Sequence, residues 1–171
     1  MKKCKNCKES FNPLHFNQKY CFKKECTNVW IESEKEKQWK KKKAKIKQEL
    51  MTKSDYVKIL QQLVNKYVRE RDGNFCISCN KKVSGKIDAG HMFSVGNYPS
   101  VRFDLRNINS QCIKCNQYNG GSLLEYRENL IKKIGLKDFE DLEFKAHQNR
   151  QYTINEIKDL IQHYKGLLKN I

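Results

Sequence analysis

Apolar residues recur at the three- and four-residue spacing of a single helical face in three parts of the chain, residues 56–68, 123–134 and 157–168. A shorter helical piece is expected at 139–146. Each of the three long stripes has one apolar side. The pattern therefore predicts amphipathic helices that pack their stripes into a common core.

Residues with capping preferences mark the ends of these helices. Ser54 or Asp55 can cap the first helix, which is expected to stop at Gly73, and the second is expected to stop at Gly135. The last begins with the capping-box pattern of residues 153–156, where Thr and Glu stand three positions apart.

Two further segments lack such a stripe. Residues 27–52 are dense in Lys, contain no Gly or Pro and offer only scattered apolar residues, which predicts a polar linker helix. Residues 74–121 hold most of the Gly and only short β-like pieces, at 75–78, 86–91 and 101–103. Tight turns and close backbone approaches are expected there, and this segment is expected to contain the functional site.

Charge and composition limit the classes of protein to which this chain can belong. The 171 residues include 35 Lys and Arg against 19 Asp and Glu, a formal charge of +16. Nucleic acid is the first candidate partner of such an excess, although a basic surface kept for solubility is an equal alternative. No apolar run is long enough for a membrane span and no signal peptide is evident, so a cytoplasmic protein is expected.

Eight cysteines fall into four pairs, and this spacing predicts two metal sites in a reducing compartment. The first 26 residues are too short for a core of their own, so a bound Zn²⁺ would have to stabilise them as a small zinc finger. The second quartet predicts a closed, structural Zn²⁺ site. The ligands are Cys4, Cys7, Cys21 and Cys26 for the first site and Cys76, Cys79, Cys112 and Cys115 for the second.

Between and just after the second pairs stand a His, an Asn 16 positions later and an Asn nine positions beyond that. This order, with a cysteine pair before each end, resembles the HNH endonuclease motif, here His91, Asn107 and Asn116. Hydrolysis of a phosphodiester needs a base and a cation, and a neutral imidazole suits the first role at cellular pH.

The HNH resemblance implies a ββα-metal core with one Mg²⁺ or Mn²⁺ at the scissile phosphate and products with 5′-phosphate and 3′-hydroxyl ends. His91 would be the general base, Asn107 would tie the hairpin loop to the following helix, and Asn116 would be a metal ligand. Many HNH motifs place an acid or a second His directly before the base. Gly90 holds that place here, and Asp88 is the nearest acid that could reach the ion.

A wider resemblance covers most of the chain. It rests on the finger, the Lys-rich helix and the segments Tyr67–Asp72, Cys76–Cys79, Ala89–His91, Arg102–Asn107, Gln111–Gln117 and Tyr126–Arg127. These are similar to the lambda-type phage NinG family, also called Rap. That resemblance implies a bacterial host cell, a role in phage recombination and cleavage of branched DNA such as Holliday junctions and D-loops.

Basic residues are assigned to DNA more loosely. They are Lys40, Lys41, Lys42, Lys43, Arg102 and Arg106. The two arginines flank Asp104 and could instead pair with it. The family tends to carry Lys where this chain has Asn119, so one phosphate contact is missing or replaced. Symmetrical cutting of a junction would need two active sites, which suggests a homodimer, and host or phage recombination proteins are further candidate partners.

The expected fold is α+β, with a zinc finger at 1–26, a linker helix at 27–52 and an HNH domain at 53–171 whose motif core is 74–121. The leading hypothesis is a metal-dependent DNA endonuclease. The alternative is a non-catalytic DNA-binding or recombination-mediator protein with two zinc ions and a decayed HNH core, which the missing acid and the missing Lys favour. Retention of His91 and Asn107 favours the nuclease.

Overall fold

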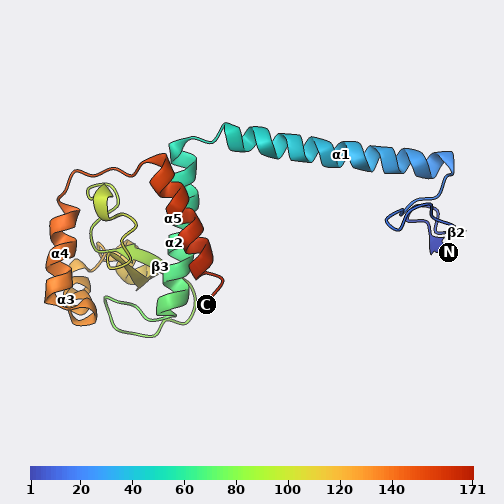
Figure 1. The fold of residues 1–171 in the computed structure, drawn as a ribbon. Helices are drawn as coiled ribbons and strands as arrows, with labels where there is room; N and C mark the ends of the chain where they lie inside the picture. Colours follow the sequence, from blue (N-terminus) through green and yellow to red (C-terminus); the bar gives the residue numbers. More distant parts are fainter. The chain divides into compact units, whose positions relative to one another are not determined.

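A computed structural model describes all residues from Met1 to Ile171, which form two compact units, Met1–Met51 and Thr52–Ile171 (Figure 1). In the first unit, strands β1 (Lys2–Lys3) and β2 (Ser10–Phe11) pair antiparallel. Helix α1 (Lys24–Glu49) follows and buries only Cys26. The weak apolar pattern of this segment thus gives a solvated helix, as expected, stabilised by pairs such as Lys40 with Glu36 at 2.6 Å.

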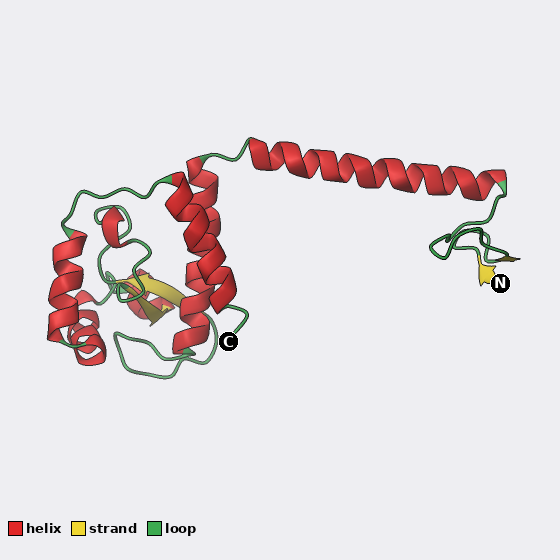
Figure 2. Ribbon diagram, in the orientation of Figure 1, coloured by secondary structure: helices red, strands yellow, loops and turns green.

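The second unit combines helices with one two-stranded sheet (Figure 2). Strands β3 (Ile87–His91) and β4 (Ile108–Cys112) pair antiparallel, and each helix is joined to this hairpin directly or through another helix. The helices are α2 (Lys53–Asp72), α3 (Leu123–Ile134), α4 (Leu136–Ala146) and α5 (Ile154–Leu167), with a 3₁₀ turn η1 (Pro99–Val101) and a short π-helix η2 (Lys114–Tyr118). The mixed helix and sheet class is confirmed.

Two apolar clusters make the core of this unit. In the first, α2 and α5 pack on each other and on the hairpin through residues such as Leu60, Ile157 and Ile108, all fully buried. In the second, α3 and α4 pack around Phe93 and Val101 from the loop between the strands. The predicted stripes are therefore core, except at the start of α3, where Leu123 and Leu124 are exposed and Tyr126 is buried instead. The stripes hold the hairpin between two helix pairs.

The helix ends follow the predicted capping chemistry, with one exception. Thr153 and Glu156 form the expected capping box of α5, and Gly73 follows the end of α2 with a positive φ of 60°. The predicted cap of α2 is wrong: Thr52, not Ser54 or Asp55, is the N-cap, and Asp55 is its capping-box partner. Thr52 lies three residues before Asp55, which is the spacing this motif requires.

Two of the three predicted β-like pieces are wrong. Residues 75–78 make only one bridge, from Phe75 to Lys82, and residues 101–103 form the end of the 3₁₀ turn and the turn after it. The third, 86–91, is confirmed as β3, but strand β4 was not predicted. Its side chains from Asn109 to Gln111 are polar yet no more than 2% exposed, so the segment lacks the alternation of a half-buried strand.

No helix of the structure is both long enough and apolar enough to cross a membrane. This agrees with the sequence, in which no apolar run reached that length.

Asp72 joins the end of α2 to the hairpin and to α3. Its carboxylate accepts hydrogen bonds from Arg71, from the Ser110 amide at 2.9 Å and from Lys133 at 2.9 Å. Burial opposes ionisation of Asp72, but these three donors outweigh it and lower the pKa of the carboxyl. Asp72 is thus an ionised anchor at the junction of three elements.

We expect Asp72→Asn to lower the free energy of unfolding by about 1–3 kcal/mol at pH 7, because charged hydrogen bonds to partly buried donors are lost. Because folding lowers the pKa of Asp72, its contribution is complete above the ordinary Asp value and is lost as the pH falls through the folded value. Urea unfolding between pH 3 and 7 should show the gap to wild type closing at the acid end. The exposed Asp159→Asn is the control, and an equal effect of both changes would contradict the role of Asp72.

Candidate functional site

The two cysteine quartets each bring four sulfur atoms together. All eight cysteines are free thiols, and the ligand atoms within each quartet lie within 4.8 Å of one another. Four sulfurs about 2.3 Å from one tetrahedral Zn²⁺ lie about 3.8 Å apart. The Cys7 and Cys21 sulfurs are 3.7 Å apart. Each quartet therefore fits a closed, structural zinc ion, in agreement with the predicted sites.

The first pair of each quartet has the same backbone conformation. Lys8 and Asn80, directly after Cys7 and Cys79, have positive φ angles of 64° and 52°. Their amides donate to the carbonyls of Cys4 and Cys76, each at 3.0 Å. In the second pair of each quartet, the last cysteine lies in a helix, Cys26 in α1 and Cys115 in η2. Unrelated sequences have thus built the same kind of metal site twice.

In the first quartet the thiolate form is favoured at Cys4, whereas at Cys7 and Cys21 backbone hydrogen bonds are outweighed by burial and the neighbouring thiols, which raise the pKa of both thiols. Although burial of Cys4 opposes ionisation, backbone hydrogen bonds, the largest of them with Cys21, lower the pKa of its thiol to about 6. The Cys21 amide lies 3.3 Å from the Cys4 sulfur. In the second quartet the Cys115 amide makes a similar contact with the Cys112 sulfur at 3.4 Å.

The second quartet anchors one end of the β3–β4 hairpin. Cys112 pairs in register with Ile87 at the start of β3, whereas His91 pairs with Ile108 at the far end. The first cysteine pair is tied to β4 by the Ile77 amide, which donates to Ser110 at 2.8 Å. Helix α3 holds the same pair through Asn129, which donates to the carbonyls of Ile77 and Ser78. The metal site and His91 thus lie at opposite ends of the hairpin.

His91 is the last residue of β3 and is partly buried. Its Nε2 lies 3.2 Å from the carbonyl oxygen of Arg102. Burial is the main reason that the pKa of the imidazole is lowered, and the charge of Arg102 acts in the same direction. The ring is therefore neutral at pH 7 and retains a nitrogen that can accept a proton.

Asn107 is fully buried and closes the loop between the strands. Its side-chain nitrogen donates to the carbonyls of Phe93 and Val101, at 3.0 and 3.1 Å, and its oxygen accepts from the Phe93 amide at 2.7 Å. The two arms of the loop are thereby held together beside His91. The HNH resemblance implied a link to the following helix, and that link is made by Tyr126 of α3 instead.

Asp88 and Asn116 lie together but apart from His91. The Asp88 carboxylate accepts from the side-chain amides of Asn116, at 3.0 Å, and Gln117, at 2.7 Å. Asp88 and His91 are three positions apart in one strand, so their side chains point to opposite faces of the hairpin. The structure therefore joins Asp88 to Asn116 and places Asn107 near the loop of His91, but it does not bring all four residues to one side.

Carboxylate and imidazole groups do not gather into a third metal site. Apart from the two quartets, no three His, Cys, Asp or Glu ligand atoms lie close enough to share one ion. Asp88 with its two amide partners offers the hard oxygen atoms that Mg²⁺ prefers. However, the residues around His91 do not fit a catalytic ion bound beside the imidazole.

Gln111 explains why Gly90 stands directly before His91. A Cβ atom at Gly90 would lie 2.1 Å from Oε1 of Gln111 and 3.1 Å from its Cβ. Gln111 is 1% exposed, and its amide donates to the Ser78 hydroxyl at 2.7 Å and to the Gly121 carbonyl at 2.6 Å. The space that an acid would need at position 90 is thus filled by a side chain fixed to the second quartet.

The two arginines expected at phosphate differ in their partners. Arg106 forms ion pairs with Asp104 and Asp141, at 2.7 and 2.8 Å, so its charge is neutralised within the protein. Arg102 donates to the side-chain oxygen of Gln61 at 2.9 Å, without an acidic partner. Lys40 to Lys43 are exposed on α1, where Lys40 also pairs with Glu36.

Tyr126 is a residue of this site that sequence reasoning did not assign. It is fully buried, and its hydroxyl donates to the carbonyls of Gly90, at 3.0 Å, and Asn107, at 3.3 Å, and accepts from Asn109. It thus joins α3 to the residues that precede His91 and close its loop. The only available signal was a tyrosine near the start of a stripe that otherwise consists of aliphatic residues.

The geometry defines a strongly basic protein with two Cys4 metal sites, in which one site anchors a histidine-bearing hairpin. The family model described as Bacteriophage Lambda NinG protein matches residues 1–171, and the chain belongs to this family. It is 36% identical over 188 residues to Protein ninG of Escherichia phage 933W, covering 99% of this chain and 93% of that protein. Protein ninG of Escherichia phage lambda is 35% identical over 190 residues, with the same coverage. No solved structure matches the chain.

We expect Gly90→Ala to lower the free energy of unfolding by about 1–3 kcal/mol, because the new methyl group displaces Gln111 from its hydrogen bonds. Gly96→Ala is the matched control, since a Cβ there meets nothing within 4 Å. Urea unfolding with zinc present measures both.

The same change in a Gln111→Ala background should cost much less, because the space is then open. Equal stability of Gly90→Ala and Gly96→Ala would contradict this account.

Proposed function

We propose that the protein is a DNA endonuclease of the HNH type that acts on branched DNA in phage recombination. The observation that carries the proposal is a partly buried imidazole at the end of β3, its pKa lowered by burial, beside a loop closed by Asn107. A base that is neutral at pH 7 and fixed in orientation is what deprotonation of an attacking water requires. The branched substrate and the recombination partners rest on the family resemblance alone.

The role of His91 follows from its contacts. When the Arg102 carbonyl accepts a hydrogen bond from Nε2, that nitrogen carries the proton and Nδ1 is left as the base. His91 can then take a proton from water, and the nearby guanidinium of Arg102, which has no acidic partner, can bind a phosphate oxygen. Asn107 and Tyr126 are positioning residues, because they touch the loop and the backbone rather than the reacting atoms.

A divalent ion would supply charge neutralisation at the leaving oxygen when bound. Asp88 and Asn116 are the residues that we would assign to it, but they face away from His91. In the proposed mechanism that ion therefore has no part in the proton transfer from water to His91. The same observation favours the second candidate function, a non-catalytic DNA-binding or recombination-mediator protein with two zinc ions.

Cell location and assembly follow from the proposal. A phage recombination enzyme would act in the cytoplasm of the bacterial host, and symmetrical cutting of a four-way junction would require two copies of His91, as in a homodimer.

We expect wild-type protein with Mg²⁺ or Mn²⁺ to cut junction or D-loop DNA, and His91→Ala to cut at least about 100-fold more slowly, because the general base is lost. His163→Ala, an exposed histidine of α5, is the control and should retain full activity. Since the pKa of His91 is lowered, the rate should stay constant from neutral pH down to about 6.5, the ordinary His value, and decline only below it.

Two results would contradict the nuclease. One is cleavage by His91→Ala at the wild-type rate, and the other is a wild-type protein that shifts these substrates in a gel without cutting them or nicking a supercoiled plasmid. The second result would establish the DNA-binding alternative.

A further inference from the structure

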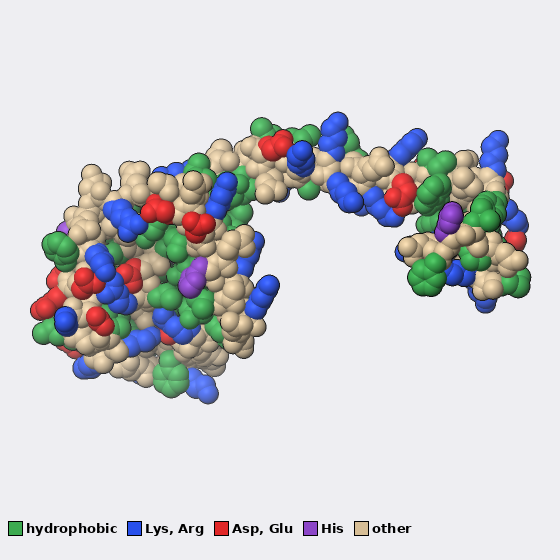
Figure 3. All heavy atoms as spheres, viewed as in Figure 1, with side chains coloured by type: hydrophobic (Ala, Val, Ile, Leu, Met, Phe, Trp, Pro, Cys, Tyr) green, Lys and Arg blue, Asp and Glu red, His purple; other side chains and the backbone are tan.

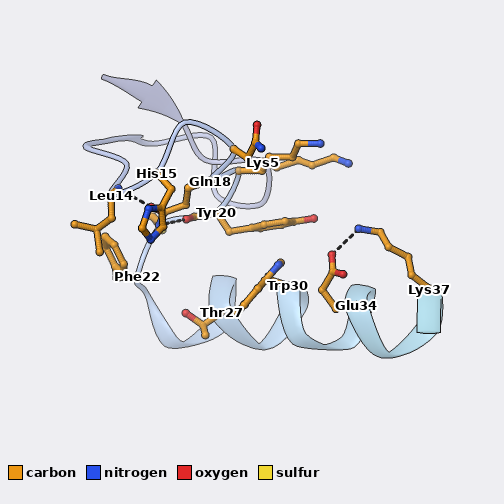
Figure 4. Close-up of a pocket in the computed structure, with 13 residues that line it drawn as sticks. Lys5, Leu14, His15, Gln18, Tyr20, Phe22, Thr27, Trp30, Glu34 and Lys37 are labelled. Atoms are coloured by element: carbon orange, nitrogen blue, oxygen red, sulfur yellow. Dashed lines mark hydrogen bonds and ion pairs between the residues drawn. The ribbon is translucent and has the colours of Figure 1, made fainter. Parts of the chain in front are cut away.

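The first unit contains an aromatic groove beside the first metal site, whose ligand Cys21 lies in its lining, and the proposed nuclease chemistry does not use it. It has a volume of about 810 Å³, within the range of roughly 300–1,000 Å³ typical of small-ligand clefts. The finger supplies one wall and the first turns of α1 supply the other (Figure 4). Its apolar and ring-bearing side chains are Leu14, His15, Tyr20, Phe22 and Trp30.

These rings remain accessible. Trp30 is 48% exposed and Phe22 is 63% exposed, although both lie beside a folded metal site. In Figure 4 the Tyr20 ring and the Trp30 side chain face each other across the groove, and Leu14, His15 and Phe22 gather at one end. A chain with a small core has thus left a tryptophan and a phenylalanine ring in contact with water, an arrangement that suits a flat ligand.

Positive charge surrounds the same groove. Lys5, Lys19 and Lys37 line it, and Lys37 is paired with Glu34 at 2.6 Å. A second hollow of about 520 Å³ shares Lys5 and Lys19 with the groove. That hollow is lined by five lysines in all, Lys2, Lys3, Lys5, Lys8 and Lys19.

The rest of the first unit also carries a net positive charge. The first 51 residues hold 15 Lys against six acidic residues, an excess of nine positive charges. Lysine side chains are distributed along α1 and the finger (Figure 3). An apolar peptide would make use of the rings but not of these charges. A polyanion that carries flat rings would use both.

We propose that this aromatic groove binds unpaired nucleobases of single-stranded DNA, with the adjoining lysine hollow holding the backbone phosphates. Base stacking on aromatic side chains and a basic track for the backbone are the two elements by which proteins bind single strands without sequence preference. Paired bases in a duplex keep their faces stacked on one another and cannot enter. The groove would therefore direct the protein to unpaired segments, such as those exposed in branched DNA.

This inference rests on DNA being the partner, as proposed above, but not on cleavage. Binding can therefore be measured in the His91→Ala background without added Mg²⁺, where no substrate is cut. The probes are a labelled oligo-dT strand and a labelled duplex of equal length, at the same salt concentration, because phosphate contacts depend strongly on salt.

The two tryptophans of the chain provide a matched pair. Trp30 lines the groove, whereas Trp39, on the same helix and 62% exposed, does not. We expect Trp30→Ala to weaken binding of oligo-dT by about 10-fold or more and binding of duplex by less than about twofold, because stacking is available only to unpaired bases. Trp39→Ala should change neither, and Trp30→Phe should restore most of the loss.

A second measurement separates stacking from a change in folding. In a Trp39→Phe protein, Trp30 is the only tryptophan, and oligo-dT should quench its fluorescence while duplex should not. Bound zinc is measured in every variant to show that the finger is intact.

Unchanged oligo-dT affinity in Trp30→Ala, or an equal loss for both probes, would overturn the inference while leaving the proposed nuclease in place. Failure of the parent protein to bind oligo-dT would overturn this inference, and failure to bind a four-way junction as well would overturn both.

Discussion

The convergence of Cys76, Cys79, Cys112 and Cys115 on one site, where they would hold a single tetrahedral ion, is the constraint on which the second unit depends. These cysteines come from two segments separated by 32 residues, and the hairpin, its loop and Asn107 lie between them. A two-stranded sheet alone is marginally stable in water. With the ion at one end and the two helix pairs on its sides, the hairpin becomes rigid enough to fix His91 at the other end.

The interior next to the second quartet is polar, and its buried side chains determine which residues fit beside His91. Asn109, Ser110 and Gln111 of β4 are buried, and their side chains are bonded to Arg71, Val68 and Ser78 respectively. No buried side-chain nitrogen or oxygen lacks a partner. Gln111 in particular joins the metal site to the backbone at Gly90 and so excludes an acid next to His91. The absence of an acid at position 90, where many HNH motifs have one, is therefore part of how this region packs.

Whether an element could be predicted from the sequence depended on the kind of side chain that it buries. Helices α2, α3 and α5 bury mainly aliphatic stripes, so the spacing of apolar residues in the sequence was enough to predict these helices. The cysteine pairs were enough to predict both metal sites. Strand β4 buries polar groups, and its pairing partners come from distant segments, so no local pattern could mark it. The same holds for the site. His91 and Asn107 stood out by spacing, whereas Tyr126 acts through a hydroxyl that reaches two strands. The opposite faces of Asp88 and His91 already follow from the predicted strand at 86–91, in which they stand three positions apart.

The central claim, that the second quartet holds the hairpin in place through its metal ion, can be tested most directly by amide hydrogen exchange. Wild type and Cys79→Ser would be compared in zinc-buffered solution, with the amides of β3 and β4 followed individually. The account predicts two zinc ions per wild-type chain and, in Cys79→Ser, one zinc ion and loss of protection along both strands, His91 included. Full protection of β3 and β4 in a chain that has lost the second ion would contradict it.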